Sequence, residues 1–225
     1  DILPNKESRW MNVTTLRNVL TGKNFDFIYF DCCYMAGIEV MYELRHTTRQ
    51  IAASATVLME EGMPYQNNLG LLFAPQPDVV GAARNTFNYY NSKTDYKQSC
   101  TMSVIDCSYL DEIAEFARGA FEEAETLTAT ADIQRYTIDN PCYYYDFMDY
   151  VKAIGGKSSS YINLEMSMND AVLYKANTQS LWGGILSIDR HSGLSTYIVR
   201  NAADANTYGY NELSWWNDVV HVMFK

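Results

Sequence analysis

The sequence lacks the patterns that build membrane spans, disulfide frameworks and zinc sites. No stretch of 18 consecutive apolar residues is present, so we expect no membrane span. The five cysteines form no C-x-x-C pair, and an odd number in 225 residues does not indicate a disulfide framework. With 17 basic and 27 acidic residues the net charge is −10, which argues against nucleic-acid binding. The share of hydrophobic residues, 48%, is typical of a globular domain.

The apolar pattern predicts one α/β domain that covers residues 1–225. FDFIYF (25–30) has the apolar density of a strand buried on both faces. Residues 35–45 repeat apolar side chains at helical spacing, and the short segment 51–55 suits a second strand, which completes a βαβ unit. We therefore expect a mainly parallel sheet. Further helices are predicted over 79–90, 108–127, 143–154 and 211–222, and further strands over 101–105, 171–175, 181–188 and 194–199.

Two adjacent cysteines, Cys32 and Cys33, follow an aspartate where the first strand gives way to the helix. If the strand continues through Cys33, alternation places Asp31 and Cys33 on one side and turns Cys32 into the core as a small hydrophobe. Cys33 would then lie at the carboxyl end of a parallel strand and directly before a helix, whose N-terminus favours a thiolate. This arrangement predicts Cys33 as a nucleophile, although two buried, inert cysteines remain an alternative.

The segment FDFIYFDCCYMAGIEVMYELRHTTRQIAASATVLMEEGMPY resembles the clostripain family of cysteine peptidases, relatives of caspases, gingipains and legumain. The shared pattern is a hydrophobic strand, a D-x-C block, a helix, a strand ending in Ala-Ser, and a loop containing Glu61, Gly62 and Tyr65. The later segments 101–116 and 192–199 are similar too. The resemblance implies a caspase-like fold, with a mainly parallel sheet flanked by helices on both faces. It also implies an endopeptidase with Cys33 as nucleophile and the Cys33 backbone N–H in the oxyanion hole.

A histidine suited to this chemistry is missing from the chain. A cysteine peptidase needs a base that takes the thiol proton, and the candidates are His46 on a helix, His191 in a turn and His221 in the last helix. In the family that is resembled, the histidine lies in a His-Gly motif before the cysteine, and cleavage between the two gives a light and a heavy chain. We therefore expect this chain to be the heavy chain, beginning at Asp1, and the upstream light chain to carry the catalytic histidine.

Two carboxylates are expected near the thiol. Asp31 alone would oppose thiolate formation, so its presence makes sense if a cation occupies the site. Glu61 follows the second strand, and parallel strands end at the same edge of a sheet. Two acids suit an arginine or lysine side chain, and the resemblance implies that both positions form the floor of the S1 pocket. We therefore predict Asp31 and Glu61 as substrate-binding residues and cleavage after Arg or Lys. An ordinary solvated loop acid is the alternative for Glu61.

Other functions and partners follow from the same residues. A catalytically inactive caspase-like module that serves as an aromatic-rich binding surface is the alternative to a peptidase. No cofactor is expected, because no EF-hand pattern is present, although some relatives need calcium. The expected partners are the light chain and proteins or peptides with a basic P1 residue. The resemblance further implies secretion, or a periplasmic or cell-surface location, in a bacterium.

Overall fold

The computed structural model describes residues 11–124, 127, 129–207 and 209–225. A four-stranded sheet lies at the centre, in the order β1 (Phe25–Tyr29), β2 (Thr48–Ala53), β3 (Thr101–Asp106) and β5 (Val172–Asn177). β1 and β2 are parallel, whereas β3 is antiparallel to both of its neighbours. Three of the four strands therefore run in one direction, and β3 runs against them.

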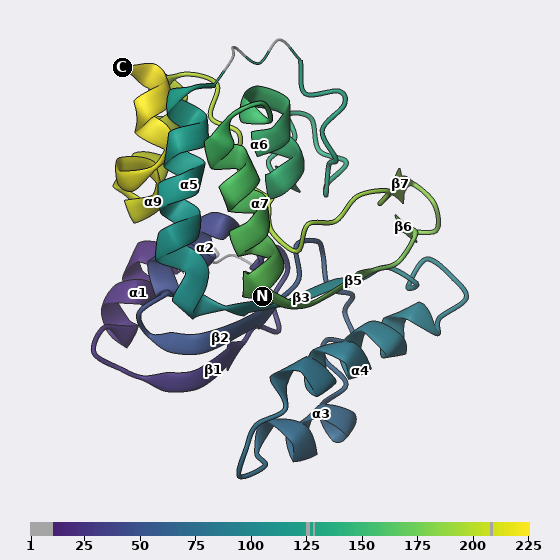
Figure 1. The fold of residues 1–225 in the computed structure, drawn as a ribbon. Coiled ribbons are helices and arrows are strands. Elements are labelled where there is room, and N and C mark those ends of the chain that lie inside the picture. Colours follow the sequence, from purple (N-terminus) through teal and green to yellow (C-terminus); the bar gives the residue numbers. More distant parts are fainter. Residues whose placement is uncertain (1–10, 125–126, 128, 208) are drawn as a thin grey trace, which may run out of the picture.

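Helices cover both faces of this sheet, as Figure 1 shows. On one face lie α2 (Ile38–Leu44), α5 (Leu110–Glu122), α6 (Phe147–Gly155) and α7 (Ser159–Ala171), whose apolar side chains form the main core. On the other face α3 (Tyr65–Leu72) packs against α4 (Val79–Asn91), which contacts β2 and β3. The predicted fold class, an α/β sheet with helices on both faces, is therefore confirmed.

Smaller elements complete the described chain. Helix α1 (Val13–Leu20) packs on α2, and α2 also contacts α9 (Ser214–Asp218). Two short antiparallel pairs lie outside the main sheet. The pairs are β4 (Tyr145–Asp146) with β8 (Ser195–Thr196) and β6 (Ser180–Leu181) with β7 (Leu186–Ser187); the remaining helical elements are α8 (Ala202–Thr207) and the 3-10 turns Cys107–Tyr109, Tyr210–Glu212 and Val220–Phe224.

Two predicted strands and two predicted helices differ from the structure. Segment 181–188 is a hairpin rather than one strand, because the chain reverses through left-handed residues at Trp182, Gly183 and Gly184. Segment 194–199 contains only the two-residue strand β8. Segment 143–154 contains the short strand β4 before α6 begins. The last predicted helix is divided between α9 and two 3-10 turns.

Strand β1 is less buried than its apolar sequence predicts. Phe25 is 40% exposed, Asp26 is also exposed, and the rest of β1 is half-buried. Within the described residues β1 pairs with β2 alone, so it forms an outer edge of the sheet. The expectation of a strand buried on both faces is therefore wrong for this chain.

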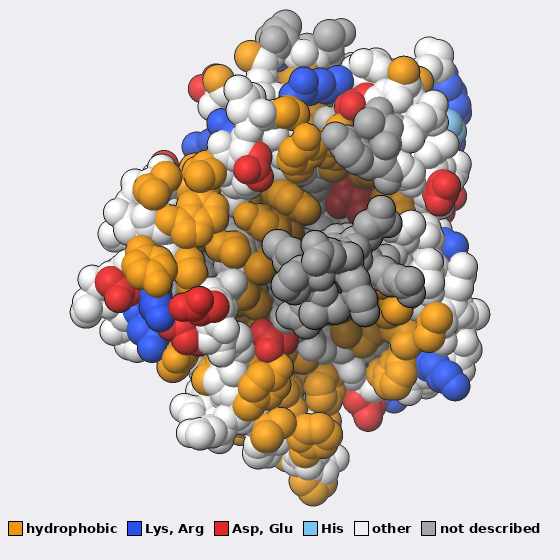
Figure 2. Space-filling model, turned by 180° about the vertical axis from the view of Figure 1, so that it is seen from behind, with side chains coloured by type: hydrophobic (Ala, Val, Ile, Leu, Met, Phe, Trp, Pro, Cys, Tyr) orange, Lys and Arg blue, Asp and Glu red, His pale blue; other side chains and the backbone are white. Residues whose placement is uncertain are grey.

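An exposed apolar stripe lies on α3. Tyr65, Leu69 and Phe73 follow one another at four-residue spacing and are 51%, 45% and 80% exposed. Hydrophobic side chains gather at the bottom of Figure 2, over this helix. Tyr65 begins the stripe next to the residues of the candidate site.

In the described part of the chain, no helix is long and apolar enough to cross a membrane.

Candidate active site

The turn that carries the two cysteines is held by the end of β2. After Tyr29 the chain leaves the strand conformation and turns through residues 32–34. Tyr34 takes a left-handed backbone conformation, with φ 60°, and its N–H donates to the Thr56 carbonyl at 3.0 Å. The Ala36 N–H donates to the Ser54 carbonyl at 2.9 Å. Strained backbone of this kind persists where surrounding contacts enforce it, and here the hydrogen bonds to Ser54 and Thr56, just after β2, do so.

Two predictions about the cysteine pair are wrong, because β1 ends before the cysteines and α2 begins well after them. Cys32 does not fill the core: it is exposed, and partial burial together with the nearby Asp31 raises the pKa of its thiol. Helix α2 begins only at Ile38, with Gly37 as its N-cap. Cys33 therefore does not lie at a helix N-terminus, and the predicted contribution of a helix dipole to its thiol is absent.

Cys33 is exposed, and a backbone donor points at its sulfur. The Leu58 N–H donates to Cys33 Sγ at 3.3 Å, and the Leu58 carbonyl lies 3.6 Å from the same atom. The Cys33 sulfur is thus positioned by two backbone groups of Leu58, one a donor and the other an acceptor. Among the described residues, no acceptor takes the backbone N–H of Cys33, which leaves this donor available for an oxyanion.

The Asp31 carboxylate faces the same loop as the Cys33 thiol. A Cβ on Gly62 would lie 3.1 Å from Asp31 Oδ2, and the positive φ of Gly62 (+65°) also favours glycine there. The Tyr65 hydroxyl donates to Asp31 Oδ2, and this bond raises the pKa of Tyr65. The buried Tyr90 hydroxyl supports the loop by donating to the Gly62 carbonyl at 2.6 Å. Asp31 and Cys33 are thus both directed at residues 58–65.

Glu61 lies in this loop, but its carboxylate is paired within the chain. The Lys97 ammonium donates to Glu61 Oε1 and lies 3.6 Å from Glu60 Oε1. The hydrogen bond from Lys97 lowers the pKa of Glu61 and in turn raises the pKa of Lys97. The structure therefore brings Asp31 and Cys33 to one loop and turns the third predicted residue toward a lysine.

The three histidines of the chain make their contacts away from Cys33. His46 Nε2 lies 3.9 Å from Asp111, and His221 Nδ1 lies 3.2 Å from the Trp216 carbonyl. His191 is held between the Tyr136 hydroxyl at 2.8 Å and Ser103 Oγ at 3.3 Å. The base that the thiol needs is thus not supplied by any of them in this arrangement.

Sequence reasoning missed three residues of the site. Tyr65 belongs to the loop pattern that carried the resemblance, and its spacing from Glu61 could have suggested a role. Leu58 acts through its backbone, which no side-chain pattern reveals. Lys97 lies 36 residues from Glu61 on another loop, so no local pattern connects the two.

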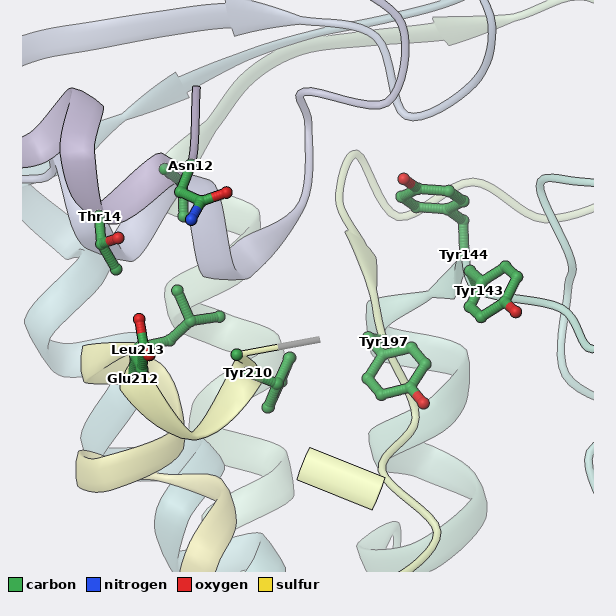
Figure 3. A pocket seen from close by; sticks show the side chains of 10 residues that line it. Asn12, Thr14, Tyr143, Tyr144, Tyr197, Tyr210, Glu212 and Leu213 are labelled. Carbon is green, nitrogen blue, oxygen red and sulfur yellow. The ribbon is translucent and has the colours of Figure 1, made fainter. Parts of the chain in front are cut away.

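A cavity of about 560 Å³ is connected to the cysteine turn through one of its lining residues, Tyr144. Figure 3 shows Tyr143, Tyr144 and Tyr197 on one side and Tyr210, Glu212 and Leu213 on the other. The ring of Tyr34, the residue after Cys33, stacks on Tyr144 with centroids 4.2 Å apart. Within the described residues, no group of three or more His, Cys, Asp or Glu side chains could hold a metal ion.

The sequence was compared with models of known protein families. Residues 4–220 match the family model of the clostripain family, Peptidase C11. The chain belongs to the clostripain family. Its D-x-C block, Asp31 to Cys33, lies within the matched residues. No curated protein matches the chain.

Solved structures of clostripain-family proteins share the fold. An inactive zymogen C11 protease from Parabacteroides distasonis is 32% identical, with a TM-score of 0.84 over 93% of this chain and 62% of the other. A secreted C11 cysteine protease from Bacteroides thetaiotaomicron, in complex with an irreversible peptide inhibitor, is 28% identical, with a TM-score of 0.82 over 95% and 64%. This clostripain-family chain therefore spans about three fifths of the length of these two relatives.

A further likeness extends over nearly whole chains. A clostripain from Bacteroides thetaiotaomicron is 24% identical, with a TM-score of 0.82, over 96% of this chain and 95% of the other. At this identity the likeness concerns the fold. The caspase-like architecture expected from the resemblance is thereby confirmed.

Proposed function

We propose that this chain carries the nucleophile of a cysteine endopeptidase that cleaves after Arg or Lys. The observation that carries the proposal is the joint placement of the Cys33 thiol and the Asp31 carboxylate against one loop. An exposed thiol with an N–H donor at its sulfur suits nucleophilic attack, and a carboxylate beside it suits a cationic P1 side chain. Membership of the clostripain family adds to this support.

In the proposed reaction Cys33 Sγ attacks the carbonyl carbon of the scissile bond. The thiol proton passes to a histidine, the carbonyl oxygen gains negative charge, and the Cys33 N–H donates to it. The histidine then gives its proton to the leaving amine as the C–N bond breaks. Water hydrolyses the thioester that remains and restores the thiol.

The histidine of this reaction is proposed to come from an upstream light chain. The contacts of His46, His191 and His221 support an external source, and a zymogen relative supports activation by cleavage. The outer edge of β1 offers backbone groups with which another strand could pair. Activation by autoprocessing, and secretion or a periplasmic or cell-surface location in a bacterium, are further parts of the proposal.

The P1 preference tests this function directly. Peptides that differ only at P1 should be cleaved after Arg and Lys and spared when P1 is apolar or acidic. Asp31→Asn should lower kcat/KM for the Arg peptide by roughly 30-fold or more, since it removes one partner of a charge pair that the bound side chain covers. Steady-state assays of wild type and variant on the active protein give the comparison.

Two outcomes would contradict the proposal. A wild type that prefers an apolar or acidic P1 residue rules out the acidic pocket. No hydrolysis of any peptide by the protein with its light chain would favour the inactive binding module instead.

A further inference from the structure

Lys97 places a cation on one of the two acids that are proposed to bind the P1 side chain. Its ammonium pairs with Glu61 and lies 3.6 Å from Glu60. The Lys97 and Glu61 side chains keep 26% and 23% of their surface exposed, so a ligand can reach the pair. Because each partner shifts the pKa of the other toward ionisation, both stay charged around neutral pH.

The loop that presents Lys97 is fixed by its own hydrogen bonds. The Lys97 N–H donates to Asp95 Oδ1 at 2.9 Å, and the Ser99 N–H donates to the Lys97 carbonyl at 2.7 Å. Ser99 Oγ accepts the Trp182 N–H at 2.6 Å, which connects this loop to the turn of the β6–β7 hairpin. The ammonium is therefore delivered by an ordered segment from a different part of the chain.

The charges around the site show what this lysine does. Asp31 and Glu61 carry one negative charge each, and Gly62, the neighbour of Glu61, borders the Asp31 carboxylate. Lys97 cancels the charge of Glu61 and occupies one of its oxygens. A P1 cation entering the site therefore meets Asp31, which forms no ion pair among the described residues, or has to compete with Lys97 for Glu61.

We propose that Lys97 is a specificity-determining residue, a resident cation that weakens the response of the site to a charged P1 side chain. The inference rests on the proposed basic P1 preference and adds to it the residue that sets its strength. Exchanging Lys97 for an uncharged residue would release Glu61 as a second acceptor for the P1 cation. If Lys97 only anchored its loop, the same exchange would impair all substrates alike.

The test compares two peptides that differ only in charge at P1, one with arginine and one with its neutral isostere citrulline. Lys97→Met should raise kcat/KM for the arginine peptide by roughly two- to five-fold, mainly through KM, in keeping with the strength of exposed ion pairs. It should leave the citrulline peptide unchanged. Lys97→Arg, which keeps the charge, should behave as wild type does, and Lys97→Met combined with Glu61→Gln should lose the gain.

The outcomes separate this inference from the proposed function. A wild type that cleaves after arginine, together with a Lys97→Met variant that changes both peptides equally or neither, would overturn the role of Lys97 alone. A wild type that treats arginine and citrulline alike would overturn the basic P1 preference itself. An arginine-specific gain that persists when Glu61→Gln is added would show that Lys97 does not act through Glu61.

Discussion

The two adjacent cysteines differ in what surrounds their sulfur atoms. Cys33 Sγ receives the Leu58 N–H, whereas the pKa of Cys32 is raised by partial burial and by Asp31. The sequence predicted from strand alternation that the two residues differ and that Asp31 and Cys33 face the same way; both now face residues 58–65, although β1 ends before them. It could not predict the Leu58 donor or the Lys97 cation, because loops that are distant in sequence bring them to the site.

His191 shows that a residue interpreted from sequence as part of a turn can be structural. Tyr136 donates to Asp146 Oδ2 at 2.6 Å, so its oxygen accepts from His191 Nδ1, and Nε2 faces Ser103 Oγ. Burial lowers the pKa of His191 to about 4, with Lys175 adding to the effect and Asp146 opposing it. The half-buried ring is therefore neutral at physiological pH.

The stability contributed by neutral His191 should fall as the pH falls. An unfolded histidine binds a proton near pH 6.5 and the folded one only near pH 4, so protonation favours the unfolded chain between these values. Between pH 8 and pH 5 the difference in unfolding free energy between wild type and His191→Gln should shrink by about 2 kcal/mol. Urea unfolding at both pH values measures it. His46→Gln, at an exposed histidine, is the control; a difference for His191→Gln that does not change with pH would contradict this account.

At the scale of elements, two long amphipathic helices were predicted correctly, whereas α1, α3 and α7 were missed. The predicted helices over α4 and α5 are present, as both carry apolar residues at regular helical spacing. Helix α7 was not predicted: its serine-rich start resembles a loop, and two of its buried positions, Ser167 and Ala171, are small. The direction of β3 was also not predictable, because a run of apolar residues indicates that a strand is buried but not whether it is parallel or antiparallel to its neighbours.

Helix α1 is attached to the domain by an ion pair with a buried acid. Arg17 Nη1 donates to Glu43 Oε2 at 2.6 Å and to Ser214 Oγ at 3.1 Å, and the Glu43 side chain has no exposed surface. Glu43 also accepts the Ser214 N–H at the start of α9. This carboxylate thus connects α1, α2 and α9.

Arg17→Met should destabilise the protein by about 2–3 kcal/mol, because it leaves a buried carboxylate with only the Ser214 donors. Arg49→Met is the matched control: its pair with Asp26 spans 3.9 Å, and both side chains are more than two thirds exposed. That change should cost at most about 0.5 kcal/mol. Denaturant midpoints of the two variants provide the test, and equal losses would contradict the role of the buried acid.

At the scale of the whole molecule, the caspase-like architecture places the cysteine turn and the 58–65 loop beyond the carboxyl ends of the parallel strands β1 and β2. The resemblance of the D-x-C segment predicted this architecture, because the fold depends on the order of strands and helices rather than on their exact ends. The division of the site between this chain and a light chain is a proposal. It is proposed from the contacts that occupy the three histidines.

Labelling with a peptidyl arginine chloromethyl ketone tests the central claim, that Cys33 is the nucleophile of a peptidase with basic specificity. The reagent delivers an arginine side chain to the P1 site and alkylates the sulfur that lies there, with loss of chloride. Peptide mapping by mass spectrometry should place a single adduct on Cys33 in the active wild type and in Cys32→Ala, with hydrolysis lost in both. Cys33→Ala should neither react nor hydrolyse peptides. An adduct on Cys32 in the wild type, or a Cys33→Ala variant that still cleaves after arginine, would contradict the assignment.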